Sequence, residues 1–206
     1  MSTRTWLLAA GVFSLGACQS ATAPGETLSP ADAQFLAEAL DVGGSGILDG
    51  LFLSGGPAAA PASVPGSSTT TITFERTRTC QEGGTLVVAG SLTRVWDGEA
   101  ESYDVEGSGT KTRTDCAFSR GDVVITVDGS GEWTHERHYV QREPAGVWVT
   151  TWVGSFDWAK STDESGSCSY DLTRTVDTAA NSVTLVGSFC GNVVDRSRTW
   201  RDQPAQ

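Results

Sequence analysis

Cysteine is the residue type in this chain whose position points most clearly to chemistry. Cys18 follows Leu15-Gly16-Ala17 at the end of an apolar run from Trp6 to Phe13, and Arg4 precedes that run. A thiol is a nucleophile, and small neighbouring side chains let a peptidase approach the backbone. Residues 1–17 are therefore predicted to be a secretion signal.

The stretch Leu15-Gly16-Ala17-Cys18 resembles the lipobox of bacterial lipoproteins. This resemblance implies export to the cell envelope, cleavage before Cys18, and attachment of a diacylglycerol and of acyl chains such as palmitate to that residue. Gln19 in the next position, in place of aspartate, implies sorting to the outer membrane, on its periplasmic or its surface side. Two alternatives stay open, an ordinary signal peptide with an incidental cysteine and a transmembrane anchor. The apolar run is well short of the ~20 residues that a bilayer requires.

The other four cysteines, an even number in a chain predicted to be exported, predict two disulfides. Cys168 and Cys190 each lie eleven residues from Ala179, the centre of a predicted hairpin, so we expect them to face each other. Cys80 then pairs with Cys116, although a strand separates them and two strand spacings come to about 9.6 Å, against a bridging limit of about 7 Å. If the first and last strands meet, Cys80 can pair with Cys190 instead. No two of these cysteines have the close spacing of a zinc site.

Other catalytic arrangements are poorly supported by the sequence. His135 and His138 are three residues apart on a predicted strand, so they point to opposite faces and cannot easily share a metal. The serines of the Gly-Ser pairs lack the Gly-x-Ser-x-Gly pattern of a nucleophile elbow. The sequence has no phosphate-binding loop and no cofactor motif. We expect no catalytic residues, no metal, no cofactor and no enzymatic activity, and a triad built on His135 is the enzyme alternative.

Length and charge restrict the remaining possibilities. The chain has 206 residues and a formal net charge of -11, which fits one domain of ordinary size with a tether. The net negative charge excludes nucleic acid as an expected partner of the chain after the signal. It also disfavours direct binding of that part of the chain to anionic membrane surfaces. The membrane contact is therefore expected through the lipid on Cys18, and no protein partner is indicated.

The segment before the main domain divides into three parts. Residues 18–28 are small and polar, as in a lipid-anchored tether. Residues 29–53 form a short helical segment, in which Ser29 can cap the first helix and Asp32 follows three residues after the cap. Residues 54–68 are rich in Gly, Ala, Pro and Ser, which is typical of a linker. We expect the helix to cover the domain with an apolar stripe formed by Phe35, Leu36, Ala39 and Leu40, and the alternative is that this segment faces the bilayer.

Residues 69–201 are predicted to form an all-β domain, because β-branched and aromatic residues alternate with polar ones. Turn residues recur at short intervals, and such short connections join only antiparallel neighbours. We therefore expect an up-and-down meander of about eight strands that closes, or nearly closes, into a barrel. The expected strands cover residues 69–80, 85–96, 101–115, 121–138, 146–158, 167–177, 182–190 and 193–200.

The alternation assigns most apolar and aromatic residues to one face, with acidic residues on the other. Gly90, Gly107, Gly129, Gly154 and Gly187 share the apolar face, which indicates either sharp coiling of the sheet or room for a ligand. A single bulge reverses the assignment beyond it. The basic residues of the apolar face are Arg76, Arg78, Arg94, Lys111, Arg113, Arg137, Arg174, Arg196 and Arg198. The acidic residues of the other face are Glu75, Asp104, Glu106, Asp128, Glu132, Glu136, Asp157, Asp171 and Asp195.

Basic residues on an apolar face lead to a ligand hypothesis. Burying an unpaired arginine is costly, so each must reach water at a strand end, pair with a carboxylate, or meet an anionic ligand. We therefore expect a pocket for an anionic amphiphile such as a fatty acid or lipid. The alternative is a structural or protein-interaction domain of the cell envelope, without a small-molecule ligand, whose aromatic residues fill a core. The predicted ligand-binding residues are Trp148, Trp152, Phe156, Arg78, Arg113 and Arg174.

Overall fold

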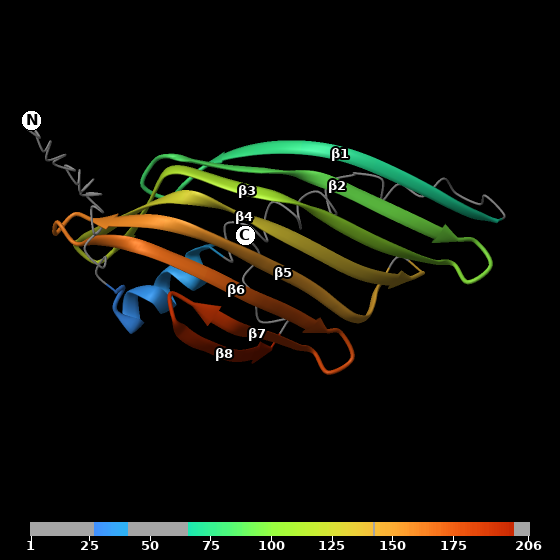
Figure 1. The fold of residues 1–206 in the computed structure, drawn as a ribbon. Helices are drawn as coiled ribbons and strands as arrows, with labels where there is room; N and C mark the ends of the chain where they lie inside the picture. Colours follow the sequence, from blue (N-terminus) through green and yellow to red (C-terminus); the bar gives the residue numbers. More distant parts are fainter. Residues whose placement is uncertain (1–26, 41–65, 142, 200–206) are drawn as a thin grey trace, which may run out of the picture.

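The structure, a computed structural model, describes residues 27–40, 66–141 and 143–199. Eight strands form one antiparallel sheet in which each strand lies beside its neighbours in the sequence, and a helix over residues 30–40 precedes them (Figure 1). The predicted meander is therefore confirmed, with strand ends that differ by a few residues from those expected. The strands are β1 (Ser67–Thr79), β2 (Thr85–Asp97), β3 (Ser102–Arg120), β4 (Val123–Val140), β5 (Glu143–Lys160), β6 (Ser165–Asp177), β7 (Ser182–Phe189) and β8 (Asn192–Thr199).

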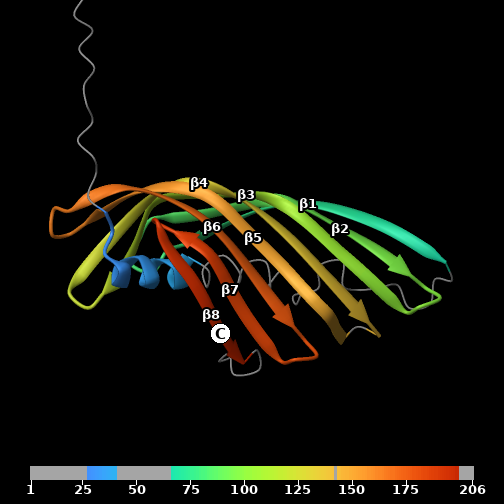
Figure 2. The same ribbon diagram turned by 60° about the horizontal axis from the view of Figure 1, so that its bottom comes forward.

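The sheet is an open arch and not a closed barrel (Figure 2). Within the described strands, β1 pairs only with β2 and β8 pairs only with β7, so the expected closure is not confirmed. The two edges are unequal, since β1 has 13 residues and β8 has 8, and a junction between them would leave part of β1 unpaired. The helix lies under the arch, where it occupies space that a closed barrel fills with strand side chains.

The helix belongs to the hydrophobic core. Leu36 is fully buried and Leu40 is buried, whereas Phe35 and Ala39 are half-buried and pack against the same core, as the predicted stripe requires. Leu28, Ala33 and Ala37 add further buried contacts. The predicted signal, Cys18 and the rest of the helical segment beyond residue 40 lie outside the described residues. Among the residues that the structure describes, no helix is long and apolar enough to cross a membrane.

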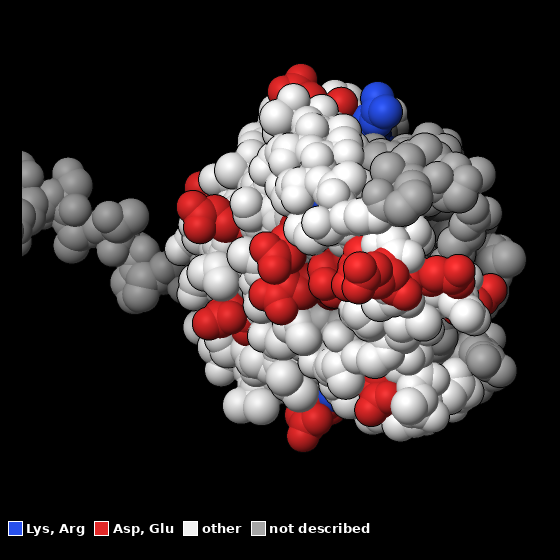
Figure 3. All heavy atoms as spheres, turned by 90° about the vertical axis from the view of Figure 1, so that its right-hand side faces the viewer, with Lys and Arg blue, Asp and Glu red and all other residues white. Residues whose placement is uncertain are grey.

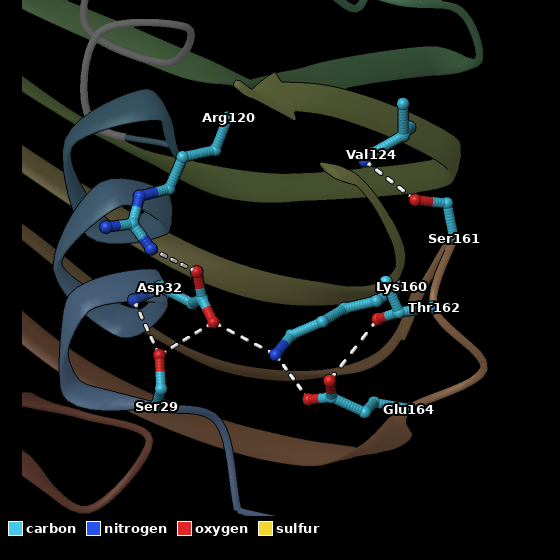
Figure 4. Close-up of polar contacts among 8 residues, drawn as sticks. All are labelled: Ser29, Asp32, Arg120, Val124, Lys160, Ser161, Thr162 and Glu164. Atoms are coloured by element: carbon cyan, nitrogen blue, oxygen red, sulfur yellow. Dashed lines mark hydrogen bonds and ion pairs between the residues drawn. The ribbon is translucent and has the colours of Figure 1, made fainter. Parts of the chain in front are cut away.

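A polar network fixes the start of the helix to the sheet (Figure 4). Ser29 caps the helix as predicted, because the Asp32 N–H donates to Ser29 Oγ at 3.2 Å and the Ser29 hydroxyl donates to the Asp32 carboxylate at 2.7 Å. Asp32 also accepts from Arg120 at the end of β3 and from Lys160 at the end of β5. Burial alone would raise the pKa of Asp32, but hydrogen bonds from Ser29, Lys160 and Arg120 lower it to about 2. The carboxylate therefore stays ionised and holds the helix against two hairpins.

Both predicted disulfides form, Cys80–Cys116 and Cys168–Cys190, and the alternative pairing of Cys80 with Cys190 is wrong. The expected obstacle to Cys80–Cys116 disappears because β2 begins only at Thr85. The turn before it takes the place of a strand beside β3, where Glu82 N–H donates to the Ala117 carbonyl and Ala117 N–H donates to the Gly83 carbonyl, each at 3.0 Å. The two Cα atoms are thus 5.4 Å apart, within bridging range.

A β-bulge in β3 changes which residues face the core near this disulfide. The register shifts between Arg113 and Cys116, Asp115 has a positive φ of 50°, and its N–H donates to an Asp128 carboxylate oxygen at 2.7 Å. Arg113 and Cys116 therefore both face the core, although strict alternation would separate them. The same shift carries Phe118 into the core, where it is buried.

The predicted division of the two faces is confirmed. The concave face, to which the buried apolar residues of the strands point, packs against the helix, and all nine acidic residues assigned to the other face are exposed. Aromatic side chains fill the space above several glycines of the concave face. A Cβ atom at Gly90 would lie 2.6 Å from the Trp133 ring, and one at Gly131 would lie 2.2 Å from the Tyr170 hydroxyl. These glycines thus accommodate core side chains and leave no room for a ligand above them.

Candidate functional site

Basic side chains lie buried on the concave face, in an environment where charge is costly. Five cationic residues are less than 9% exposed, and the only buried acidic residue that the structure describes is Asp32 on the helix. Most of the predicted basic residues therefore do not escape to the rim of the sheet. The buried cations are Arg94, Lys111, Arg113, Arg137 and Arg174.

His135 is buried among these cations on the concave face, and its pKa is lowered. It is 2% exposed, and its Nδ1 lies 2.7 Å from the Thr150 hydroxyl oxygen. Burial, and then the positive charges of Arg137, Arg174 and Lys111, lower the pKa of His135 to about 2. The imidazole is therefore neutral, and the three nearby cations give this part of the concave face a positive potential. His138, in contrast, points to the convex face and contacts Asp104, as expected for histidines three residues apart.

Three of the buried cations are stabilised by aromatic rings. Arg94 lies 4.7 Å from the centre of the Tyr103 ring, Arg137 lies 4.5 Å from that of Trp148, and the Lys111 ammonium lies 4.8 Å from that of Trp152. Such cation–π contacts lower the cost of burying a cation. Trp148 and Trp152, which were predicted to bind a ligand, thus stabilise buried cations instead.

Arg113 and Arg174 have no comparable partner. Neither forms an ion pair or a cation–π contact with a described residue, and the buried donors Arg113 Nη1 and Arg174 Nε have no hydrogen-bond acceptor. A buried donor without an acceptor costs about 1–3 kcal/mol, and more when it is charged. An anion bound beside either guanidinium would remove that penalty.

Arg113 lines a pocket of about 450 Å³ between the helix and strands β1 to β3, which we call the Arg113 pocket. Arg78, exposed on β1, lines the same pocket, so two of the three predicted arginines converge there. The walls are mainly apolar and include the Cys80–Cys116 disulfide. The lining residues are Phe35, Glu38, Ala39, Leu40, Arg78, Thr79, Cys80, Gln81, Leu86, Arg113, Cys116 and Phe118.

The structure places the other predicted site residues elsewhere. Trp148, Trp152 and Phe156 are buried in the core and do not line the Arg113 pocket. Phe156, for example, packs against Tyr170 and Phe189 with ring centres 6.0 and 5.6 Å away. Arg174 lines a different pocket, which faces β6 to β8. The apolar wall beside Arg113 comes instead from residues that strand alternation did not assign to a ligand.

Those residues are Phe35 and Leu40 of the helix and Phe118 of β3. The helical stripe was visible in the sequence, but nothing in it showed which part of the sheet the helix would cover. Phe118 was hidden by the bulge at Asp115, since alternation without the bulge directs it to the convex face.

One end of the sheet carries a band of exposed acidic side chains. The helix and both disulfides lie at one end, whereas the β2–β3 and β4–β5 hairpins lie at the other. Figure 3 shows a band of acidic side chains across this second end, with few Lys or Arg in view. Exposed acidic residues there include Asp97, Glu99, Glu101 and Glu143. The Arg113 pocket lies at the opposite end, distant from the acidic band.

Comparisons with protein-family models, with curated proteins and with solved structures found no match to this chain.

Proposed function

We propose that the protein is an exported lipoprotein, anchored to the outer membrane by acyl chains on Cys18, whose β domain binds one anionic amphiphile in the Arg113 pocket. The observation that carries the ligand proposal is the buried Arg113 guanidinium, whose Nη1 has no acceptor beside a pocket with mainly apolar walls. A fatty acid or lipid combines the two chemistries that such a pocket offers, an anionic head for the guanidinium and an apolar chain for the walls.

The geometry suggests how such a ligand would lie. The carboxylate or phosphate accepts hydrogen bonds from Arg113, and Arg78 adds positive charge at the solvent-exposed side of the pocket. The apolar chain contacts Phe35, Leu40 and Phe118. A volume of about 450 Å³ is within the range of small-molecule sites. Because the helix forms one wall, the ligand site depends on the attachment of the helix through Asp32.

The anchor proposal is supported by the lipobox resemblance and by the two disulfides. Disulfides persist in oxidising compartments such as the periplasm, so they are compatible with export. Labelling of producing cells with a palmitate analogue tests the anchor directly. The chain should incorporate the label and partition with membranes, and Cys18→Ala should abolish both. Equal labelling of Cys18→Ala would refute acylation at this residue.

Native mass spectrometry tests the ligand. Residues 19–206, a fragment that includes the helix, would be exported with a conventional cleavable signal peptide. The protein would then be purified without detergent. We expect an added mass that leaves on denaturation and extracts as a fatty acid or lipid. Arg113→Met should lose it, and Arg76→Met, a control at an exposed arginine of β1, should retain it. A ligand-free mass that does not change when fatty acid is added would contradict the ligand proposal.

That negative result would favour a structural or protein-interaction domain of the cell envelope. The observation that supports this second function is that no described strand pairs with the outer edge of β1 or of β8. β1 is a long edge strand with nearly all of its residues exposed, and Val193 of β8 is 87% exposed. An open edge offers unpaired backbone groups to a strand of another protein.

A further inference from the structure

A second pocket, of about 600 Å³, lies between the helix and strands β6 to β8. It is separate from the Arg113 pocket, which faces β1 to β3, and the two share only the helix residue Glu38. Its lining is more polar. Arg174, Arg196 and Arg198 line it together with Ser197 and Asp195, and Leu185 supplies part of an apolar wall.

Arg174 gives this pocket a buried cation without an anion. The residue is 5% exposed, and its Nε is a buried donor with no acceptor. Its neighbours across the sheet are Thr150 on β5 and Leu185 on β7. Thr150 already contacts His135, and Leu185 offers no acceptor from its side chain. Neither cross-strand neighbour therefore neutralises Arg174, and no described residue forms an ion pair with it.

A second cation in the pocket is held by a weak counter-ion. Arg196 forms an ion pair with Glu38, and the two side chains are 36% and 52% exposed. Ion pairs this exposed contribute little to stability, because water screens them. An anionic ligand can therefore displace Glu38 from Arg196 at small cost.

We propose that this pocket is a second ligand site, which binds a phosphate-type oxyanion through Arg174 and Arg196, with Glu38 as the counter-ion that the ligand displaces. Guanidinium groups bind phosphate oxygens with paired, charge-assisted hydrogen bonds. The pocket is much larger than an oxyanion, so the phosphate belongs to a larger molecule or leaves the remaining space to water. A lipid headgroup and free phosphate share this chemistry. The site does not depend on ligand binding in the Arg113 pocket.

Calorimetric titration of residues 19–206 tests the site with two probes, inorganic phosphate and dihexanoyl phosphatidic acid, at constant ionic strength. We expect saturable binding of at least one probe. Arg174→Gln should weaken it by about tenfold or more, since a hydrogen bond to a charged group contributes about 1.5–3 kcal/mol. Glu38→Gln should strengthen it by about two- to fivefold, because Arg196 becomes free. All titrations use protein that carries Arg113→Met, because phosphatidic acid is also a ligand of the type proposed for the Arg113 pocket. Arg76→Met, at an exposed arginine outside both pockets, should leave the binding unchanged.

These variants separate the proposal from a folding defect and from the proposed function. Glu38 is exposed, so Glu38→Gln is expected to fold, and the predicted gain in affinity cannot arise from damage to the protein. Absence of saturable binding of both probes to Arg113→Met and to the double variant Arg113→Met/Glu38→Gln would overturn the proposal. Binding that Arg174→Gln leaves intact would overturn it as well. Tighter binding of phosphatidic acid would identify a lipid headgroup as the source, and equal affinity would identify free phosphate. Retention of a fatty acid, in contrast, should be lost in Arg113→Met and kept in Arg174→Gln.

Discussion

The Lys160 ammonium lies 3.0 Å from the Asp32 carboxylate and thereby joins the first turn of the helix to the end of β5. Both side chains are about nine-tenths buried, with exposed fractions of 8% and 11%. Lys160 also contacts Glu164 within its own turn, and Asp32 also contacts Arg120 from the neighbouring hairpin. Asp32 is thus the residue on which the attachment of the helix depends.

We predict that Asp32→Asn destabilises the protein by about 1–3 kcal/mol at pH 7, because it leaves Lys160 without its buried partner and weakens the helix cap. Denaturant unfolding of residues 19–206 with intact disulfides measures the change. Glu164→Gln is the matched control, since it removes the other, exposed partner of Lys160 and should cost less. An equal loss of stability in both variants would mean that the bond from Lys160 to Asp32 contributes no more than its bond to Glu164.

The ionised Asp32 carboxylate should make part of the free energy of unfolding sensitive to acid. The pKa of Asp32 is lowered to about 2 in the folded protein, from an ordinary value of 3.8. A carboxyl whose pKa is lower in the folded state stabilises the fold above its unfolded pKa, and that contribution disappears as pH falls through the folded pKa. The difference in unfolding free energy between wild type and Asp32→Asn should therefore be constant above about pH 5 and shrink between about pH 4 and pH 2. A difference that stays constant down to pH 2 would contradict this assignment.

Arg113→Met should separate stability from binding. Replacing a buried, unpaired cation with an apolar side chain of similar length is expected to stabilise the ligand-free protein by about 1 kcal/mol or more. The same change should abolish retention of an anionic amphiphile. Thermal unfolding of delipidated protein measures the first effect, and native mass spectrometry measures the second. Arg94→Met provides a contrast, because Arg94 contacts the Tyr103 ring and its loss should destabilise the protein.

Much of the fold could be predicted from the sequence because its signals are local. Alternation of apolar and polar residues identified the strands, and the short turns between them identified the antiparallel meander. The equal distances of Cys168 and Cys190 from Ala179 along the sequence identified their disulfide. Cys80–Cys116 followed only by elimination. Its geometry depends on the hydrogen bonds of Glu82 and Ala117, which pair a turn with a strand. No periodicity in the sequence signals such a pairing.

The candidate site could be predicted only in part, because alternation identifies the face of a residue and not its position over that face. Arg113 and Trp152 share the concave face, yet one lines a pocket and the other lies in the core. The sequence also could not show that the sheet would stay open, in place of the predicted barrel. The stripe of Leu36 and Leu40 indicated that the helix covers something, but it did not show that the helix would occupy the space inside the arch.

Gly131→Ala tests whether the glycines of the concave face are required by the core. An added Cβ would lie 2.2 Å from the Tyr170 hydroxyl oxygen and 2.7 Å from the Val153 carbonyl oxygen. We predict a loss of about 1–3 kcal/mol, as for other overpacked cores, although alanine is usually the better residue within a strand. Tyr170→Phe should cost less in the Gly131→Ala background than in the wild type, because it removes the closer of the two clashing oxygens. Denaturant unfolding of the double-mutant cycle measures this coupling, and Ser130→Ala, at an exposed neighbour, is the control. If Gly131→Ala proved neutral, the rings of the core would have to be free to move away from the sheet.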